Sequence, residues 1–265
     1  MAKKIALHGA AGRMGQRLVV CGNADPDWEI VAAIDAPSHP KIGTDAGLNA
    51  GIEALGVSLS SELPADVTPD AMIDFSQPAG LANVLKMCTE RKIPLVMATT
   101  GLTAEQIADL NRAAEVIPIV FAPNMSMGVN VCMKLAEIGA RALADHDADV
   151  EILERHHRYK KDSPSGTALK FGELIAKEMG IDTFRNGREG IVGERPHNEI
   201  AYHAIRTGDN PGEHTVVFGM LGETLEVTVR CSSRDGYANG AYAAAKFLQG
   251  KEPGMYDMFD VLNLK

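Results

Sequence analysis

A glycine-rich turn near the start of the chain restricts its fold more than any other feature. The turn reads Gly9-Ala10-Ala11-Gly12-Arg13-Met14-Gly15, and it joins a short apolar run at residues 5–7 to a helical apolar pattern at residues 18–21. Between a buried strand and a helix, such glycines let the backbone approach a pyrophosphate, whose charge the helix dipole favours. Because the spacing is G-x-x-G-x-x-G rather than G-x-G-x-x-G, a purely structural turn is the alternative interpretation.

An acidic residue follows the next apolar run, which covers residues 28–34. This residue, Asp35, lies 20 positions after Gly15 (35 − 15), where a dinucleotide-binding fold places the carboxylate that binds ribose hydroxyls. A carboxylate repels the 2′-phosphate of NADPH, and the next residue is Ala36, with no Lys or Arg before Lys41. The sequence therefore predicts a nicotinamide dinucleotide, with NADH favoured and NADPH as the alternative.

Strands and helices alternate as far as residue 121. Strand-like runs at residues 71–75, 94–98 and 117–121 are separated by helical stretches at 78–90 and 103–114. This alternation predicts a parallel sheet, in which ligands bind beyond the carboxyl ends of the strands. The segments at those ends are Phe75-Ser76, Ala98-Thr99-Thr100-Gly101 and Ala122-Pro123-Asn124-Met125. Each segment alone could be an ordinary turn. Because all three lie at the same edge of the sheet, we expect them to contact a cofactor.

The pattern changes after residue 126. A long helical stretch at residues 129–144 leads into strand-like runs, at residues 150–153, 200–206, 213–220 and 223–230. Leu221-Gly222 alone separates the last two runs, which predicts an antiparallel hairpin. The chain is therefore expected to be α/β with a second, α+β domain from about residue 128 to 236. In the first domain, the glycine-rich residues 37–56 are expected to form a mobile loop near the cofactor.

A cationic stretch at residues 154–168, ERHHRYKKDSPSGTA, is the strongest indication of chemistry. It leaves a strand, and Pro164 and Gly166 end it where an amphipathic helix begins. A helix N-terminus and nearby cations suit an anion, and the adjacent His156 and His157 can exchange protons near neutral pH. The stretch therefore suggests acid catalysis on an anionic substrate.

Two simpler interpretations of this stretch stay open. It could be a solvated surface loop, or its residues His156, His157 and Asp162 could be metal ligands. Adjacent residues of an extended chain point to opposite faces, so neighbouring histidines suit a single metal ion poorly.

Composition argues against several classes of protein. The net charge of -9 is unlike that of a nucleic-acid-binding protein, which needs a basic face. The four cysteines are far apart and lack a Cys-x-x-Cys pair, so neither a zinc site nor a disulfide scaffold is indicated. No apolar run is long enough to span a membrane, and the N-terminus is unlike a signal peptide. A cytoplasmic location is expected.

Taken together, the motifs resemble the 4-hydroxy-tetrahydrodipicolinate reductases, also called dihydrodipicolinate reductases. The likeness rests on the glycine turn, on residues 98–101 and on HHRYKKDSPSGTA at residues 156–168. Residues 212–215 and 233–241 extend it to nearly the whole chain. The resemblance implies NAD(P)H-dependent reduction of a small-molecule cyclic dicarboxylate in the diaminopimelate route to lysine.

The same resemblance implies an architecture. It predicts an N-terminal Rossmann-type parallel sheet domain at residues 1–127, rejoined by residues 237–265. It also predicts a C-terminal α+β domain with a mixed sheet at residues 128–236, which binds the substrate and forms a homotetramer.

Matching positions give individual residues roles by resemblance. His156 and Lys160 correspond to the proton-donating pair. His157 and the backbone of Gly166 and Thr167 correspond to contacts with the substrate carboxylates. The cofactor contacts correspond to Gly9, Ala10, Ala11, Gly12, Arg13, Met14, Asp35, Ala98, Thr99, Thr100, Ala122, Pro123, Asn124 and Met125. No metal is implied.

The chain departs from the family pattern at four positions. Ala98 stands where a glycine is common, Met125 where an aromatic residue often lies, and Val229 where a histidine is frequent. Ala36 replaces the basic residue of members that use both cofactors, which agrees with the prediction of NADH.

Two other functions are alternatives. A semialdehyde dehydrogenase has the same cofactor fold but needs an activated thiol. Cys132 lies in an apolar helical run and Cys231 at a strand end, and neither has a base nearby in sequence. A non-catalytic dinucleotide-binding protein would bind NADH without oxidising it.

Overall fold

The computed structural model describes residues 2–265, which form two compact units. The first unit runs to Met127 and resumes at Arg234–Lys265, and the second is Gly128–Ser233. The second unit thus ends at residue 233 rather than at the expected residue 236. The reason is local, because Asp235 opens helix α7 and accepts hydrogen bonds from Nε and Nη2 of Arg17 at 2.6 and 2.9 Å.

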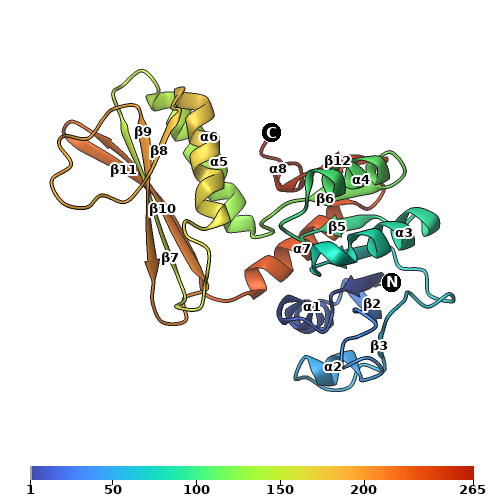
Figure 1. The fold of residues 1–265 in the computed structure, drawn as a ribbon. Helices are drawn as coiled ribbons and strands as arrows, with labels where there is room; N and C mark the ends of the chain where they lie inside the picture. Colours follow the sequence, from blue (N-terminus) through green and yellow to red (C-terminus); the bar gives the residue numbers. More distant parts are fainter. Residues whose placement is uncertain (1) are drawn as a thin grey trace. The chain divides into compact units, whose positions relative to one another are not determined.

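The first unit is built on a seven-stranded sheet in the order β12-β6-β5-β4-β1-β2-β3 (Figure 1). Its strands are β1 Lys3–His8, β2 Trp28–Ile34, β3 Leu59–Ser60, β4 Ala71–Asp74, β5 Leu95–Met97, β6 Pro118–Phe121 and β12 Gly254–Tyr256. Every neighbouring pair is parallel, which confirms the predicted parallel sheet. The returning C-terminal segment adds β12 beside β6.

Helices cover both faces of this sheet (Figure 1). They are α1 Arg13–Ala24, the 3-10 turn η1 Pro78–Gly80, α3 Leu81–Arg91, α4 Ala104–Ala114, α7 Asp235–Phe247 and α8 Met258–Val261. Successive strand residues point to opposite faces. Strand β1 therefore buries Ile5 and Leu7 against α1 and α7, and Ala6 on the side of α3 and α4. No helix within residues 2–265 is long and apolar enough to cross a membrane.

Residues 37–56, expected to form a mobile loop, are organised around one carboxylate. Asp45 accepts hydrogen bonds at 2.8–3.1 Å from four backbone N–H groups, those of Gly47, Leu48, Leu55 and Gly56. It thereby caps a short helix, α2 Ala46–Asn49. This helix was not expected, because a high glycine content conceals the capping role of a single aspartate.

The second unit contains a five-stranded sheet in the order β11-β10-β7-β9-β8. Its strands are β7 Asp149–His156, β8 Thr183–Asn186, β9 Glu199–Arg206, β10 Gly212–Met220 and β11 Glu223–Cys231. Strand β10 is antiparallel to both β7 and β11, whereas β9 is parallel to β7 and β8. The predicted hairpin and the predicted α+β domain with a mixed sheet are confirmed.

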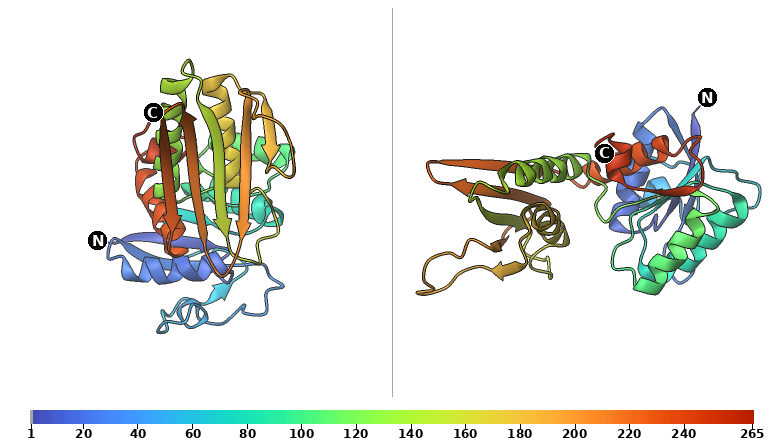
Figure 2. Two further views of the ribbon diagram at one scale, coloured as in Figure 1. Left: turned by 90° about the vertical axis from the view of Figure 1, so that its left-hand side faces the viewer. Right: turned by 90° about the horizontal axis from the view of Figure 1, so that it is seen from above.

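Helices α5 Met127–Leu143 and α6 Gly166–Met179 lie along one face of the mixed sheet, and the other face is open (Figure 2). Strand β7 alternates between buried and more exposed residues. The alternation places Glu154 and His156 on the helix-covered face and Glu151 and Leu153 on the open face.

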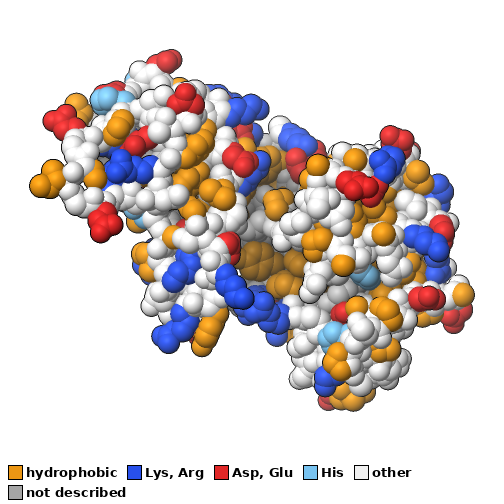
Figure 3. Space-filling model, viewed as in Figure 1, with side chains coloured by type: hydrophobic (Ala, Val, Ile, Leu, Met, Phe, Trp, Pro, Cys, Tyr) orange, Lys and Arg blue, Asp and Glu red, His pale blue; other side chains and the backbone are white. Residues whose placement is uncertain are grey.

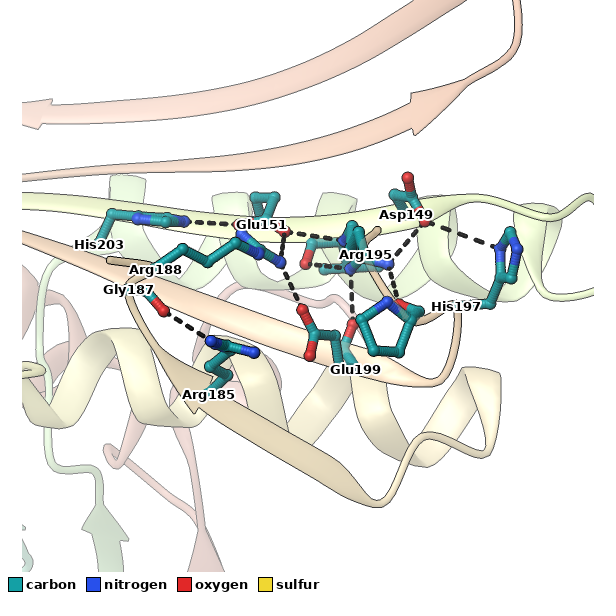
Figure 4. Close-up of polar contacts among 11 residues, drawn as sticks. Asp149, Glu151, Arg185, Gly187, Arg188, Arg195, His197, Glu199 and His203 are labelled. Carbon is teal, nitrogen blue, oxygen red and sulfur yellow. Dashed lines mark hydrogen bonds and ion pairs between the residues drawn. The ribbon is translucent and has the colours of Figure 1, made fainter. Parts of the chain in front are cut away.

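Charged side chains hold the connection between β8 and β9 against the open face (Figure 4). The carboxylate of Glu151 accepts hydrogen bonds from two nitrogens of Arg188 at 2.8 and 2.9 Å. It also accepts one from Nε of Arg195 at 2.9 Å and lies 2.5 Å from Nε2 of His203. Burial raises the pKa of Glu151, but these three partners outweigh burial and lower it to about 2.

Candidate active site

The glycine turn after β1 is packed closely against backbone. Gly9 has a φ of +77°, in the left-handed region, and a Cβ there would lie 2.6 Å from the carbonyl oxygen of Phe75. A Cβ at Gly15 would lie 2.1 Å from the carbonyl oxygen of Gly9. Both positions therefore require glycine, and its absence of a side chain lets α1 begin almost at the end of the strand.

The start of α1 and Asp35 together fit a dinucleotide. Gly12 is the N-cap and provides no side-chain cap, so the first amide groups of the helix are available to a phosphate. Oδ2 of Asp35 accepts the N–H of Ala11, and Oδ1 accepts the N–H of Ala36, each at 2.8 Å. These bonds hold the carboxylate beside the turn and leave it lone pairs for ribose hydroxyls.

The other residues expected to contact the cofactor lie at the same carboxyl edge of the sheet. Residues 98–100 follow β5, and residues 122–125 follow β6. Two of their side chains point elsewhere: Thr99 donates to the buried Asp74 at 2.5 Å, and Met125 is packed in the core shared with α1 and α7. At these two positions, only the backbone could contact a cofactor.

In the second unit, a buried carboxylate fixes the ring of His156. Oε2 of Glu154 lies 2.5 Å from Nδ1 of His156, and the two residues are 1% and 7% exposed. They are two positions apart on β7 and therefore share a face. Because a carboxylate accepts hydrogen bonds, Nδ1 carries the proton of the neutral ring, and Nε2 is left to meet a reactant.

Arg206 and Ser165 bind the same carboxylate. Nη1 and Nη2 of Arg206 donate to Oε2 and Oε1 of Glu154 at 2.7 and 2.6 Å, and the N–H of Ser165 donates to Oε1 at 3.0 Å. Sequence reasoning missed both Glu154 and Arg206 as site residues. The alternation along β7 could have indicated Glu154. Arg206 is brought to the site by strand register, since it lies on β9 opposite His156 of β7.

Burial and charge act in opposite directions on this pair. Burial raises the pKa of Glu154, but the hydrogen bonds from Arg206 and His156 outweigh it, so the pKa lies below its ordinary value. Burial lowers the pKa of His156. The carboxylate of Glu154 acts to raise it, whereas the positive charges of Lys160 and Arg206 lower it further. The ring is therefore mostly neutral at pH 7, and an anionic ligand beside it would favour the protonated form.

A further histidine, His214, completes the buried cluster and was not predicted as a site residue. It is the cross-strand partner of Glu154, and its ring centroid lies 5.2 Å from that of His156. Its Nε2 lies 3.0 Å from the hydroxyl of Ser165, which also accepts the N–H of Ala168 at 3.2 Å and caps α6. Burial lowers the pKa of His214 to about 4, so this ring stays neutral.

The remaining predicted catalytic and substrate-binding residues follow the end of β7 and open α6. Nζ of Lys160 lies 2.9 Å from a carboxylate oxygen of Asp162, and Gly166 and Thr167 form the start of the helix. Nδ1 of His157 is buried and has no hydrogen-bond partner within residues 2–265, which marks it as a group able to bind a ligand. Figure 3 shows Lys and Arg side chains gathered at this end of the second unit.

The metal interpretation of the two histidines finds no support in the geometry. Nδ1 of His156 is occupied by Glu154, and Asp162 pairs with Lys160. Across residues 2–265, no three His, Cys, Asp or Glu side chains lie close enough together to hold a metal ion.

Three of the four cysteines are unsuited to nucleophilic catalysis. Burial raises the pKa of Cys132 to about 11, and it raises the pKa of Cys88 still further. The pKa of Cys21 is also raised, chiefly by burial. Because the thiolate is the reactive form, these thiols do not provide the activated nucleophile that a semialdehyde dehydrogenase requires.

Known proteins resemble this chain over almost its full length. Residues 3–125 match the family described as dihydrodipicolinate reductase, N-terminus, and residues 128–262 match its C-terminus. The 4-hydroxy-tetrahydrodipicolinate reductase of Rhodopirellula baltica is 53% identical over 98% of this chain and 96% of its own, and that of Alkalilimnicola ehrlichii is 48% identical over 100% of both.

A solved structure gives the same result. The dipicolinate-bound dihydrodipicolinate reductase from Paenisporosarcina sp. TG-14 is 25% identical, with a TM-score of 0.78, over 98% of this chain and 99% of its own. The resemblance inferred from the motifs is confirmed, and the chain belongs to the dihydrodipicolinate reductase family.

Proposed function

We propose that the protein reduces 4-hydroxy-tetrahydrodipicolinate to tetrahydrodipicolinate with NADH or NADPH, in the diaminopimelate route to lysine. Membership of the reductase family supports the reaction. The observation that carries the proposal is the buried Glu154, which binds both the proton-exchanging ring of His156 and the backbone of Ser165 at the start of α6. Reduction of a cyclic dicarboxylate needs both parts, since its carboxylates must be held while one carbon gains a proton.

The first unit is proposed to bind the nicotinamide cofactor, which supplies a hydride when bound. Residues 9–14 and the start of α1 receive the pyrophosphate, and Asp35 receives ribose hydroxyls. Residues 98–100 and 122–125 line the same edge of the sheet. NADH is the preferred cofactor in this proposal, because the carboxylate of Asp35 repels a 2′-phosphate and Ala36 offers it no cation.

His156 is the proposed proton donor, acting through Nε2. Glu154 holds the ring by Nδ1 and favours the imidazolium, as a dianionic substrate beside the ring also does. After the proton has left, the neutral ring keeps its Nδ1–H bond to Glu154 and so stays in place. Lys160 is proposed to stabilise the negative charge that develops on the substrate ring.

The substrate carboxylates are proposed to bind His157 and the backbone of Gly166 and Thr167. His157 has a buried Nδ1 without a partner among the described residues, and the start of α6 adds amide groups and the positive end of the helix dipole. Because Glu154 binds the N–H of Ser165 as well as His156, the carboxylate site and the proton donor are held at a constant separation.

A coupled assay tests the reaction. Pyruvate, aspartate semialdehyde and the upstream synthase generate the substrate, and the losses of NADH and NADPH are followed separately. We expect both to be consumed, NADH faster at equal concentration, and neither in the absence of the synthase. Alkylation of the thiols should leave the rate unchanged, which separates this enzyme from a semialdehyde dehydrogenase. Binding of NADH without any oxidation would instead support a non-catalytic dinucleotide-binding protein.

We further infer that the protein forms a homotetramer through the open face of the mixed sheet. Leu153 and Ile205 are 37% and 41% exposed on this face, and Ile191, in the connection that covers part of it, is fully exposed. Strand β11 also lies at an edge of the sheet. Exposed apolar side chains beside an open strand edge favour association. Sedimentation equilibrium measures the mass directly, and a monomer at micromolar concentration would contradict this inference.

A further inference from the structure

A buried polar network at the carboxyl ends of three strands of the first sheet lies outside the catalytic cluster of the second unit. His8 ends β1 and is paired in register with Asp74, which ends β4, and Thr99 follows β5. Nδ1 of His8 lies 2.5 Å from Oδ1 of Asp74, and the hydroxyl of Thr99 donates to Oδ2 at 2.5 Å. All three residues are buried, and His8 is only 4% exposed.

Packing alone does not explain this network. A buried carboxylate loses its hydration and is tolerated only where it is hydrogen-bonded. The residues two positions earlier on the same face, Ala6 and Met72, are apolar and pack with α3 and α4. His8 and Asp74 replace that apolar lining at the edge where parallel sheets bind ligands.

The ring of His8 has one nitrogen left over. Oδ1 of Asp74 lies against Nδ1 of His8 and Oδ2 accepts a hydrogen bond from Thr99, so Nε2 is the ring nitrogen left to face a ligand. Within residues 2–265, Nε2 has no hydrogen-bond partner. Its neighbour Cε1 faces the turn η1, since a Cβ on Gly80 would lie 3.1 Å from Cε1 and 2.9 Å from Oγ of Ser76.

We propose that His8 is a further cofactor-binding residue, whose Nε2 accepts a hydrogen bond from a ribose hydroxyl of the bound dinucleotide. Asp74 orients the ring and at the same time fixes Thr99, and its backbone carbonyl accepts the N–H of Ala98 at 2.9 Å. One buried carboxylate thereby links the end of β1 to residues 98–100. This assignment rests on the proposed dinucleotide site of the first unit.

Replacement of His8 by asparagine separates the contributions of the two ring nitrogens. The amide nitrogen of Asn occupies the place of Nδ1 and can still donate to Asp74, but nothing occupies the place of Nε2. We expect the dissociation constant of NADH, measured by fluorescence titration without substrate, to rise about fivefold in His8→Asn, as the loss of one neutral hydrogen bond predicts. His8→Gln, whose amide oxygen reaches the place of Nε2, should recover part of the affinity.

The controls distinguish binding from folding. His197→Asn, at an exposed histidine of the second unit, should leave NADH affinity unchanged. Thermal unfolding checks that His8→Asn is folded, and the effect should appear in the KM for NADH more than in kcat, since the contact acts on binding. Unchanged NADH affinity in a well-folded His8→Asn overturns the proposal. The titration needs no dicarboxylate, so a protein that binds NADH but fails the coupled assay contradicts the proposed reaction and not the role of His8.

Discussion

Glu154 lies beneath His156, with Oε2 of the carboxylate 2.5 Å from Nδ1 of the ring. The same carboxylate receives a two-point hydrogen bond from Arg206, at 2.7 and 2.6 Å, which keeps it ionised although it is buried. Glu154 therefore fixes the tautomer and the orientation of His156 without competing for its outer nitrogen. A positioning carboxylate of this kind acts on the proton transfer through the histidine, and through the N–H of Ser165 it also holds the start of α6.

Substitution of Glu154 by glutamine should change the pH dependence of catalysis. Glu154 raises the pKa of His156 against the effect of burial, so its neutral replacement lets that pKa fall. Less of the ring is then protonated at any given pH. We expect the descending limb of kcat/KM to move to lower pH and kcat at pH 7 to fall at least about tenfold.

A matched control for this substitution is Glu173→Gln, at an exposed glutamate of α6 that pairs with Lys170. It should leave both the profile and the rate unchanged. Because Glu154→Gln leaves the charge of Arg206 unpaired, folding is checked by thermal unfolding before the profile is interpreted. A pH profile identical to that of the wild type would show that Glu154 does not act on His156.

The proposed proton-donating pair is tested by His156→Gln and Lys160→Ala. We expect each to lower kcat by about a hundredfold or more, the usual size of a general-acid contribution. NADH affinity, measured without substrate, should not change in either variant, because the proposed dinucleotide site is built from residues of the first unit. Normal turnover by a well-folded His156→Gln enzyme would exclude His156 as the donor.

The fold was predictable from the sequence where local periodicity determines it. The glycine turn, the alternating strands and helices, and the hairpin at Leu221-Gly222 all have the expected form. The short strand β3 and the capped helix α2 were not predicted. Helix α2 depends on the four hydrogen bonds that Asp45 accepts, and β3 depends on its pairing with β2. Neither rests on a repeating apolar pattern, so periodicity does not indicate them.

The site was predictable in part, and the missing residues share a physical reason. His156, Lys160 and Gly166 lie in one contiguous stretch whose composition indicates chemistry. Arg206 and His214 join the cluster through strand register, which brings together residues that are far apart in the chain. Register depends on the packing of a whole sheet against its helices, and a single sequence does not encode it locally.

Cofactor preference should change when a cation is placed beside Asp35. In Ala36→Arg, a guanidinium could pair with the 2′-phosphate of NADPH and offset repulsion by the carboxylate. We expect kcat/KM with NADPH to rise about tenfold, equivalent to about 1.4 kcal/mol, with little change for NADH. Steady-state kinetics with each cofactor give the ratio directly. Ala24→Arg, at the exposed end of α1, is the matched control, and an unaltered ratio in Ala36→Arg would refute the cofactor argument.

Acid stability should depend on Glu151. Its pKa is lowered in the folded protein from 4.5 to about 2, so its contribution to stability is complete above the unfolded-state pKa and is lost as the pH falls toward 2. The contribution amounts to at most about 3 kcal/mol. In Glu151→Gln, the free energy of unfolding in urea should be lower than in the wild type at pH 7. The difference should shrink between about pH 5 and about pH 2, the range that contains the pKa of Glu151 in the unfolded and in the folded protein. An equal difference at both ends of that range would show that the charge of Glu151 contributes nothing.

The proposed homotetramer should dissociate when charge is placed on the open face of the mixed sheet. Leu153 is 37% exposed there, and its register partners are Thr215 of β10 and His203 of β9, a ring that already pairs with Glu151. A glutamate at position 153 would have to be desolvated at each copy of a tetramer interface, which costs several kcal/mol when no cation pairs with it. We expect Leu153→Glu to sediment as a smaller species at concentrations where the wild type has the mass of a tetramer. Ile107→Glu, at a residue 40% exposed on α4 of the first unit, should stay tetrameric. If both variants keep the wild-type mass, the open face is not the interface, and the exposed apolar side chains of this sheet need another explanation.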